Sequence, residues 1–233
     1  MDINKKVAGI LGGMGPQATI NLYKAIIDKS IKEYNVRDNS EFPEMLIRNH
    51  SPKTVLDNNS LCVLRDDILD QVEKLLSNDV DFFVIPCNTI HIFTDDIRQR
   101  FDTPFVSILE SVVEEIKTTD IRDIAIVGSK TTIQNKLYEN PLRENGYDNL
   151  YIPDEDKQNK LVDIIESIIS KGANIEDANK LDIILDSLAA KGAKSVVLGC
   201  TELPLVKNML RTKLKIFDSV DVLANAVCKN IFN

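Results

Sequence analysis

The segments VIPCNTIH (84–91) and VVLGCTEL (196–203) each end an apolar run on a cysteine that small polar side chains follow. Short apolar runs like these alternate along the chain with segments of helical periodicity, which predicts α/β architecture with mainly parallel sheets. In an open parallel sheet, ligands bind beyond the carboxyl ends of the strands. We therefore expect Cys87 and Cys200 at edges of this kind.

The alternation predicts eight strands and nine helical segments. The strands are expected at residues 7–11, 44–47, 81–86, 104–108, 123–128, 149–153, 195–199 and 214–218. The helices are expected at 16–34, 64–77, 89–101, 109–118, 131–145, 156–171, 176–191, after Pro204, and at 219–231.

A weak internal repeat divides the chain. AGILGGMGPQAT (8–19) resembles AIVGSKTTIQ (125–134), and the two cysteines lie 113 positions apart. The repeat predicts two pseudo-symmetric lobes, each a mainly parallel sheet flanked by helices, with the active site between them. We expect residues 1–103 with 211–233 in the first lobe and residues 104–210 in the second.

Composition excludes several classes of function. The chain has 233 residues and a net charge of −8 without a basic tract, which disfavours nucleic acid and anionic membrane surfaces as partners. No apolar run reaches the length of a membrane span or of a signal-peptide core. We expect a cytoplasmic protein whose four cysteines are thiols.

The position of the two strand-end cysteines suggests acid–base chemistry. A helix follows each of them, and a helix N-terminus favours the thiolate over the thiol. Two exposed thiols on opposite faces of a substrate can invert a carbon centre, one removing a proton and the other supplying one. A single buried cysteine more often serves packing, and we assign Cys62 and Cys228 to that role.

Six segments resemble the aspartate/glutamate racemase family. They are GILGGMGPQAT (9–19), PCNTIH (86–91), IAIVGSKTTI (124–133), SKGANIED (170–177), VVLGCTELPL (196–205) and IFDS (216–219). Glu202 stands where glutamate racemases usually carry a histidine, so the resemblance is to the aspartate racemase branch. It implies racemisation of a small amino acid without pyridoxal phosphate, other cofactor or metal, commonly by a homodimer.

The resemblance also implies roles for individual residues. Cys87 and Cys200 are the implied acid/base pair. The substrate-binding residues are expected to be Met14, Gly15, Arg48, Lys53, Thr54, Asn88, Thr89, Ser129, Thr132, Lys171, Thr201 and Glu202. His91 and Glu202 either tune the two thiols or act as plain helix caps.

One segment departs from the family pattern. RNHSPKTVLD (48–57) stands where many aspartate racemases have PDRT, and Lys53 with Thr54 can replace the Arg-Thr pair. Aspartate, glutamate and an amino acid without a second carboxylate therefore stay open as substrates.

Other readings also stay open. An enzyme of the same fold that isomerises maleate or racemises hydantoins is one alternative, and a non-catalytic protein that binds a small carboxylate is another. Two further readings are disfavoured. A dinucleotide loop at GGMG calls for an acidic residue where Arg48 stands, and a metal site at Cys87, His91, Cys200 and Glu202 lacks a second histidine in the repeat.

Overall fold

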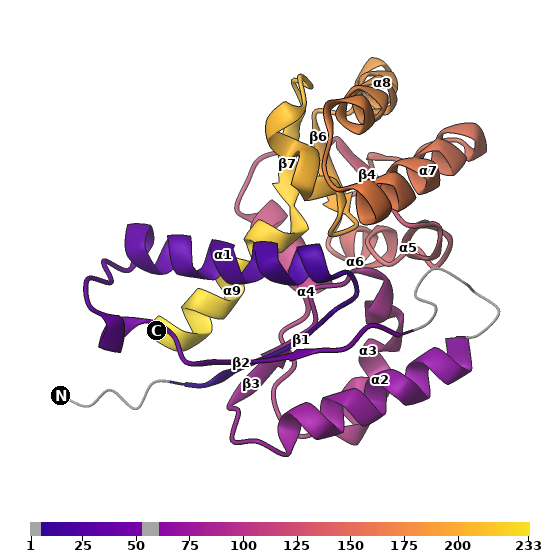
Figure 1. The fold of residues 1–233 in the computed structure, drawn as a ribbon. Coiled ribbons are helices and arrows are strands. Elements are labelled where there is room, and N and C mark those ends of the chain that lie inside the picture. Colours follow the sequence, from indigo (N-terminus) through magenta and orange to yellow (C-terminus); the bar gives the residue numbers. More distant parts are fainter. Residues whose placement is uncertain (1–5, 53–60) are drawn as a thin grey trace. The chain divides into compact units, whose positions relative to one another are not determined.

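The computed structural model describes residues 6–52 and 61–233, and the chain divides into two compact units (Figure 1). Unit 1 comprises Met1–Ser111 and Val220–Asn233, and unit 2 comprises Val112–Ser219. Each unit has its own parallel sheet flanked by helices. The α/β class predicted from the sequence is therefore confirmed.

The sheet of unit 1 contains three parallel strands in the order β2-β1-β3. These are β1 (Ala8–Gly12), β2 (Met45–Asn49) and β3 (Phe82–Val84). The strand expected at 104–108 is wrong, because only Phe105 forms a bridge, to Phe83. The carbonyl of Ser107 accepts the Ser111 N–H, so the chain is already helical from Ile108.

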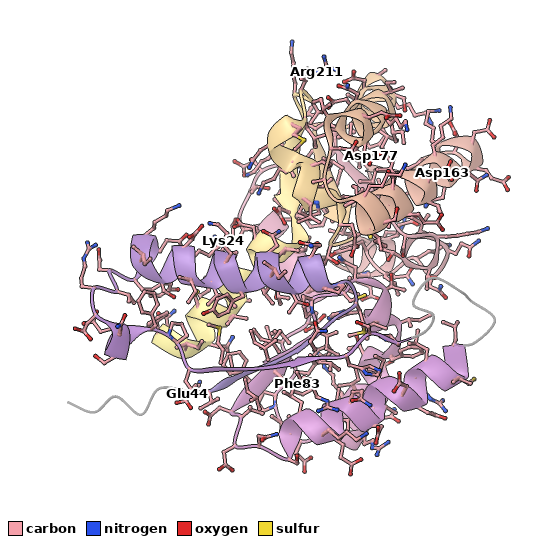
Figure 2. All side chains as sticks on the ribbon, in the orientation of Figure 1. Lys24, Glu44, Phe83, Asp163, Asp177 and Arg211 are labelled. Atoms are coloured by element: carbon pink, nitrogen blue, oxygen red, sulfur yellow. The ribbon has the colours of Figure 1, made fainter. Side chains whose placement is uncertain are left out.

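Helices cover both faces of this sheet (Figure 1). On one face α1 (Pro16–Glu33) lies beside α9 (Ser219–Phe232), where Lys29 pairs with Asp221 at 3.1 Å and Tyr34 stacks on Phe232. The other face packs against α2 (Leu61–Leu76), with Phe83 buried between them (Figure 2). The other helices that the structure describes here are η1 (Asn39–Glu41), η3 (Thr89–Phe93) and α3 (Thr94–Arg100), and α4 (Ile108–Lys117) begins in unit 1 and ends in unit 2.

Unit 2 contains four parallel strands in the order β5-β4-β6-β7. They are β4 (Ile124–Gly128), β5 (Leu150–Tyr151), β6 (Ser195–Gly199) and β7 (Lys215–Asp218). The helices are α5 (Lys130–Gln134), α6 (Glu139–Glu144), α7 (Glu155–Lys171), α8 (Ile175–Ala190) and η4 (Leu203–Met209). Apolar residues of α7 and α8 form one buried cluster with those of β4 and β6.

Three expected helices differ in detail. The segment 89–101 begins as the 3₁₀-helix η3 and continues as the α-helix α3. The segment 131–145 divides into α5 and α6, because Lys136 between them adopts a left-handed backbone with φ of 53°. The segment that contains Pro204 is a 3₁₀-helix rather than an α-helix.

The expected lobe boundaries also shift. The strand at 215–218 pairs with β6, which places it in unit 2 and not in the first lobe. Residues 104–111, which we expected in the second lobe, belong to unit 1.

Both units wind their strands in the same order. In each unit the first strand lies between the second and the third, and the fourth chain segment pairs beyond the third. In unit 1 that fourth segment is the single bridge at Phe105. Cys87 follows the third strand of unit 1 and Cys200 follows the third strand of unit 2.

Candidate active site

A glycine turn follows β1 at the carboxyl edge of the unit 1 sheet. The Gly13 N–H donates to Thr19 Oγ1 at 2.9 Å, and the Gly12 carbonyl accepts the His50 N–H at 2.9 Å. Gly13 has a φ of +99°, and a Cβ atom there would lie 2.3 Å from the His50 carbonyl oxygen. The ends of β1 and β2 therefore approach so closely that this position requires glycine.

Met14 and Gly15 continue this turn into α1. Met14 is 5% exposed and belongs to the buried cluster that also contains Cys87. Gly15 caps α1 in an extended conformation, and Pro16 begins the helix. The structure thus places Met14 in the same cluster as the first candidate thiol.

Cys87 lies in the turn between β3 and η3. Its N–H donates to the Ile85 carbonyl at 2.8 Å, and its side chain is 4% exposed. Asn88 and Thr89, the two polar residues that follow, are also buried. The first half of the predicted site is therefore a buried thiol with two buried polar neighbours.

His91 holds this turn in place through both ring nitrogens. Nδ1 lies 2.9 Å from the Cys87 carbonyl oxygen, and Nε2 accepts the Ile108 N–H at 3.1 Å. Since Nε2 accepts a hydrogen bond, Nδ1 carries the proton and donates it to the Cys87 carbonyl. His91 therefore joins the thiol-bearing turn to the start of α4, and its ring nitrogens bond backbone groups.

Burial keeps the His91 ring neutral. Desolvation lowers the pKa of His91 to about 4, although its hydrogen bond to Cys87 and the charge of Glu110 act in the opposite direction and Arg98 adds a smaller lowering effect. The ring also stacks on Phe105, with centroids 5.2 Å apart. At neutral pH it serves as an uncharged spacer.

This shift predicts acid sensitivity of unit 1. The unfolded chain binds a proton at His91 near pH 6.5, and the folded chain binds one only near pH 4. The contribution of His91 to stability is therefore fully present above pH 6.5 and is lost as the pH falls toward 4. Between pH 7.5 and 5 we expect the His91 contribution to unfolding free energy to fall by about 2 kcal/mol. Urea unfolding of the wild type and of His91→Asn at both pH values measures it, and an unchanged difference between the two proteins would contradict the expectation.

A polar ladder joins β2 to α2 beside the glycine turn. Arg48 donates through Nε and Nη2 to Gln71 Oε1 at 3.0 and 2.6 Å. His50 Nε2 lies 2.7 Å from Asp67 Oδ2. We call Arg48, His50, Asp67 and Gln71 the β2–α2 ladder. Of these four residues, only Arg48 was expected at the site from the sequence.

Cys200 in unit 2 directly follows β6 and contacts a buried carboxylate. Its thiol donates to Glu202 Oε2 at 3.0 Å, and Thr201 Oγ1 donates to the same oxygen at 3.4 Å. The three residues are between 1% and 6% exposed. Glu202 was expected to bind substrate or tune the thiol, and its contact with Cys200 favours the second role.

Ser129 and Thr132 lie at the end of β4, the neighbouring strand. Their hydroxyl oxygens are 2.9 Å apart, and Ser129 Oγ accepts the Thr132 N–H at 3.1 Å as the cap of α5. β4 and β6 run so close together here that a Cβ on Gly128 would lie 2.7 Å from the Gly199 carbonyl oxygen. The sheet register therefore brings these hydroxyls to the same edge as Cys200.

Tyr138 also lies at this edge, although it was not expected from the sequence. Its ring is buried and packs against Gly199, where a Cβ would lie 2.9 Å from the ring. Burial, with smaller contributions from Cys200 and Asp218, raises the pKa of Tyr138, so its hydroxyl stays protonated. No sequence motif marked this tyrosine, because it lies between two short helices.

Lys171 is not brought to this edge by the fold of unit 2. It is exposed and ends α7, whereas Gln158 in the first turn of α7 donates to the Gly128 carbonyl at the carboxyl end of β4. The helix rises 1.5 Å per residue, so Lys171 lies about 20 Å further along its axis. Lys53 and Thr54 lie outside the described residues.

The cysteines assigned to packing differ from each other. Cys228 is fully buried in α9, and burial raises the pKa of its thiol to about 11. Cys62 is exposed on α2, so it does not serve packing. The expected exposure of Cys87 and Cys200 is wrong as well, because both thiols follow buried strands and neighbouring side chains cover them.

Residues 6–52 and 61–233 contain no group of three or more His, Cys, Asp or Glu side chains that could hold a metal ion. No helix in the same ranges is both long enough and apolar enough to traverse a bilayer.

Comparison with known proteins identifies the family. The profile of the Asp/Glu/Hydantoin racemase family matches residues 11–227. The chain belongs to this family. Its motifs at both strand-end cysteines lie inside the matched range, and the family match together with relatives that are amino-acid racemases identifies the chain as an amino-acid racemase, an isomerase.

Individual relatives of this racemase agree in length and fold. The broad specificity amino-acid racemase RacX of Bacillus subtilis (strain 168) is 26% identical over 219 residues, which cover 94% of this chain and 95% of RacX. The crystal structure of an aspartate racemase homologue from Pyrococcus horikoshii OT3 has a TM-score of 0.80 and 25% identity, covering 98% of this chain and 100% of that one. Aspartate racemase from Picrophilus torridus shares the fold at a TM-score of 0.80 and 20% identity, covering 97% and 94% of the two chains.

Proposed function

We propose that this racemase acts on aspartate or a close relative, without a cofactor, by proton transfer between Cys87 and Cys200 at the α-carbon. One observation carries the proposal. The two units share one strand order, and each has a buried cysteine after its third strand. The neighbouring first strand leads into a glycine turn in unit 1 and into a helix capped by the Ser129 hydroxyl in unit 2. A two-sided proton transfer requires one such group from each side.

The Cys87 thiolate removes the α-hydrogen as a proton and becomes a thiol, and the electron pair left on the α-carbon delocalises into the substrate carboxyl group. The Cys200 thiol then delivers its proton to the opposite face of that carbon and becomes a thiolate. The other enantiomer runs the same step in reverse, with the two thiols exchanging roles.

Glu202 is proposed to set the resting state of Cys200. Its carboxylate accepts the thiol hydrogen at 3.0 Å, and a negative oxygen at that distance disfavours a negative sulfur. Cys200 is then protonated when the site is empty, and it is ready to act as the acid. Before Cys200 acts as the base, its thiol proton passes to Glu202, and the resulting Cys200 thiolate accepts the α-proton.

Burial is proposed to serve the same step. Cys87 and Cys200 are 4% and 6% exposed, so bulk water has little access to either sulfur. A carbanion formed beside them is then protonated by a thiol rather than by water. Asn88, Thr89, Ser129 and Thr201 supply polar groups that can hold the substrate carboxylate and amino group.

Deuterium incorporation tests the proposal. Single enantiomers of aspartate, glutamate and several neutral amino acids are incubated with the protein in deuterated water. We expect the opposite enantiomer to appear with deuterium at the α-carbon, detected by chiral chromatography with mass spectrometry. Absence of both inversion and exchange for every amino acid, in a protein shown to be folded, would refute the function.

The homodimer and the cytoplasmic location are proposals as well. Light scattering during size-exclusion chromatography measures the mass in solution against 26.2 kDa for one chain. Cell fractionation tests the location.

A further inference from the structure

We propose that His50, held by Asp67, selects substrates with a carboxylate on their side chain. The inference rests on the proposed racemase function and names the substrate class. It also assigns Arg48 a supporting role in place of the direct substrate contact expected from the sequence.

The β2–α2 ladder fixes the position of His50. Arg48 on β2 and His50, which directly follows β2, are two residues apart, about 6.6 Å, and Asp67 and Gln71 are four residues apart on α2, about 6.0 Å. The spacings match, so His50 meets Asp67 while Arg48 meets Gln71. Gln71 also donates to Asp67 Oδ1 at 3.4 Å, which joins the two rungs.

Among the basic side chains of the ladder and the Cys87 turn that the structure describes, His50 is the one suited to meet a substrate. The Arg48 guanidinium makes two bonds to Gln71, which is 5% exposed. His91 is buried, and its ring nitrogens bond backbone groups. The His50 side chain keeps 27% of its surface exposed, and Asp67 keeps 33%.

Asp67 also determines which ring nitrogen of His50 is presented. Because a carboxylate lies 2.7 Å from Nε2, that nitrogen carries a proton. Nδ1 lies on the other side of the ring. When Nδ1 is protonated too, its N–H points away from Asp67 and can donate a charge-assisted hydrogen bond to a carboxylate.

The sheet order places His50 within reach of a substrate at Cys87. His50 follows β2, Cys87 follows β3, and β1 lies between these strands, so the two strand ends are about 10 Å apart. Gly12 ends β1 and Gly13 follows it, and neither has a side chain of its own, although Thr19 packs against Gly12 and the His50 backbone against Gly13. A dicarboxylic amino acid with its α-carbon at the thiol can extend its side chain across this turn toward His50.

Substrate profiles of point variants test the inference. For the wild type, kcat/KM is measured with aspartate and glutamate and with the neutral amino acids alanine and serine. His50→Asn should lower kcat/KM for the acidic substrates on the order of 10–100-fold, mainly through KM, and should leave the neutral ones within about threefold. Asp67→Asn should give a smaller loss of the same kind.

Two further variants separate a substrate contact from general damage. His50→Lys restores a positive charge and should recover part of the activity on acidic substrates. Arg65→Gln removes the exposed ion pairs of an α2 side chain with Asp66 and Asp96 and should change the activity on neither class of substrate. Equal melting temperatures for all variants establish that the fold is intact.

The outcomes distinguish this inference from the proposed function. The role of His50 would be overturned if His50→Asn lost kcat/KM equally for acidic and neutral substrates, or if the wild type preferred neutral substrates. Neither result would contradict the proposed racemase function. If the wild type exchanges the α-hydrogen of no amino acid, both the proposed racemase function and the proposed role of His50 are contradicted.

Discussion

Replacing Cys87 or Cys200 with serine is expected to lower racemisation about 10²–10⁴-fold, the range that a positioned acid or base contributes to a rate. An alcohol is a much weaker acid than a thiol, so a serine at either position is a poor source of the anion that removes the α-proton. Both side chains are almost completely buried, and serine is nearly the same size as cysteine, so the fold should be retained.

The losses should also depend on the face of the substrate. A variant that lacks one thiol retains the base on the other side. It should therefore still exchange the α-hydrogen of one enantiomer in deuterated water while failing to invert it. Cys87→Ser and Cys200→Ser should retain this exchange with opposite enantiomers.

Cys62→Ser is the matched control for these variants. Cys62 is an exposed thiol on α2, so this variant should racemise like the wild type. Turnover of either buried-cysteine variant within about threefold of the wild type would end the two-thiol mechanism. The same loss in Cys62→Ser would show that replacing any thiol of the chain lowers activity, whether or not it lies in the site.

Gly13→Ala is expected to have the largest effect on stability, a loss of about 3 kcal/mol or more. Gly13 has a positive φ, and the added Cβ would lie 2.3, 2.6 and 2.7 Å from the O, C and N atoms of His50. These are backbone atoms, so no side-chain rotation relieves the clash. The ends of β1 and β2 must separate, which strains the His50 N–H bond to the Gly12 carbonyl.

Gly146→Ala separates the two causes of this loss. Gly146 also has a positive φ, +79°, but no atom lies within 4 Å of a Cβ built there. It should therefore lose only the backbone contribution, about 1–2 kcal/mol. Denaturant unfolding gives each loss, and hydrogen exchange should localise the Gly13→Ala effect to β1 and β2. Equal losses in the two variants would show that the approach of His50 does not matter.

The α/β class and most helices and strands could be predicted from the sequence, because the spacing of apolar residues along the chain reflects which side chains each element buries. SVVLG predicted β6 at the residues where it occurs, and α7 and α8 begin and end within one residue of the periodic segments. The family resemblance likewise rests on short motifs at the strand ends. These features depend on neighbours in the chain, and local sequence specifies them.

Other segments needed the whole fold. The run PFVSI has the composition of a strand, yet only Phe105 pairs, because Ser107 already caps the start of α4. The strand at 215–218 joined unit 2, because the choice between two sheet edges depends on which strand is available to pair with it.

The candidate site shows the same division. The sequence by itself determined that two thiols follow two strands with polar residues after them. Only tertiary structure decided that Cys200 donates to Glu202, that both His91 nitrogens bond backbone, and that His50 meets Asp67. The physical reason is that a strand or helix is encoded by its own residues, whereas a hydrogen bond between two elements depends on the distance and register at which they pack.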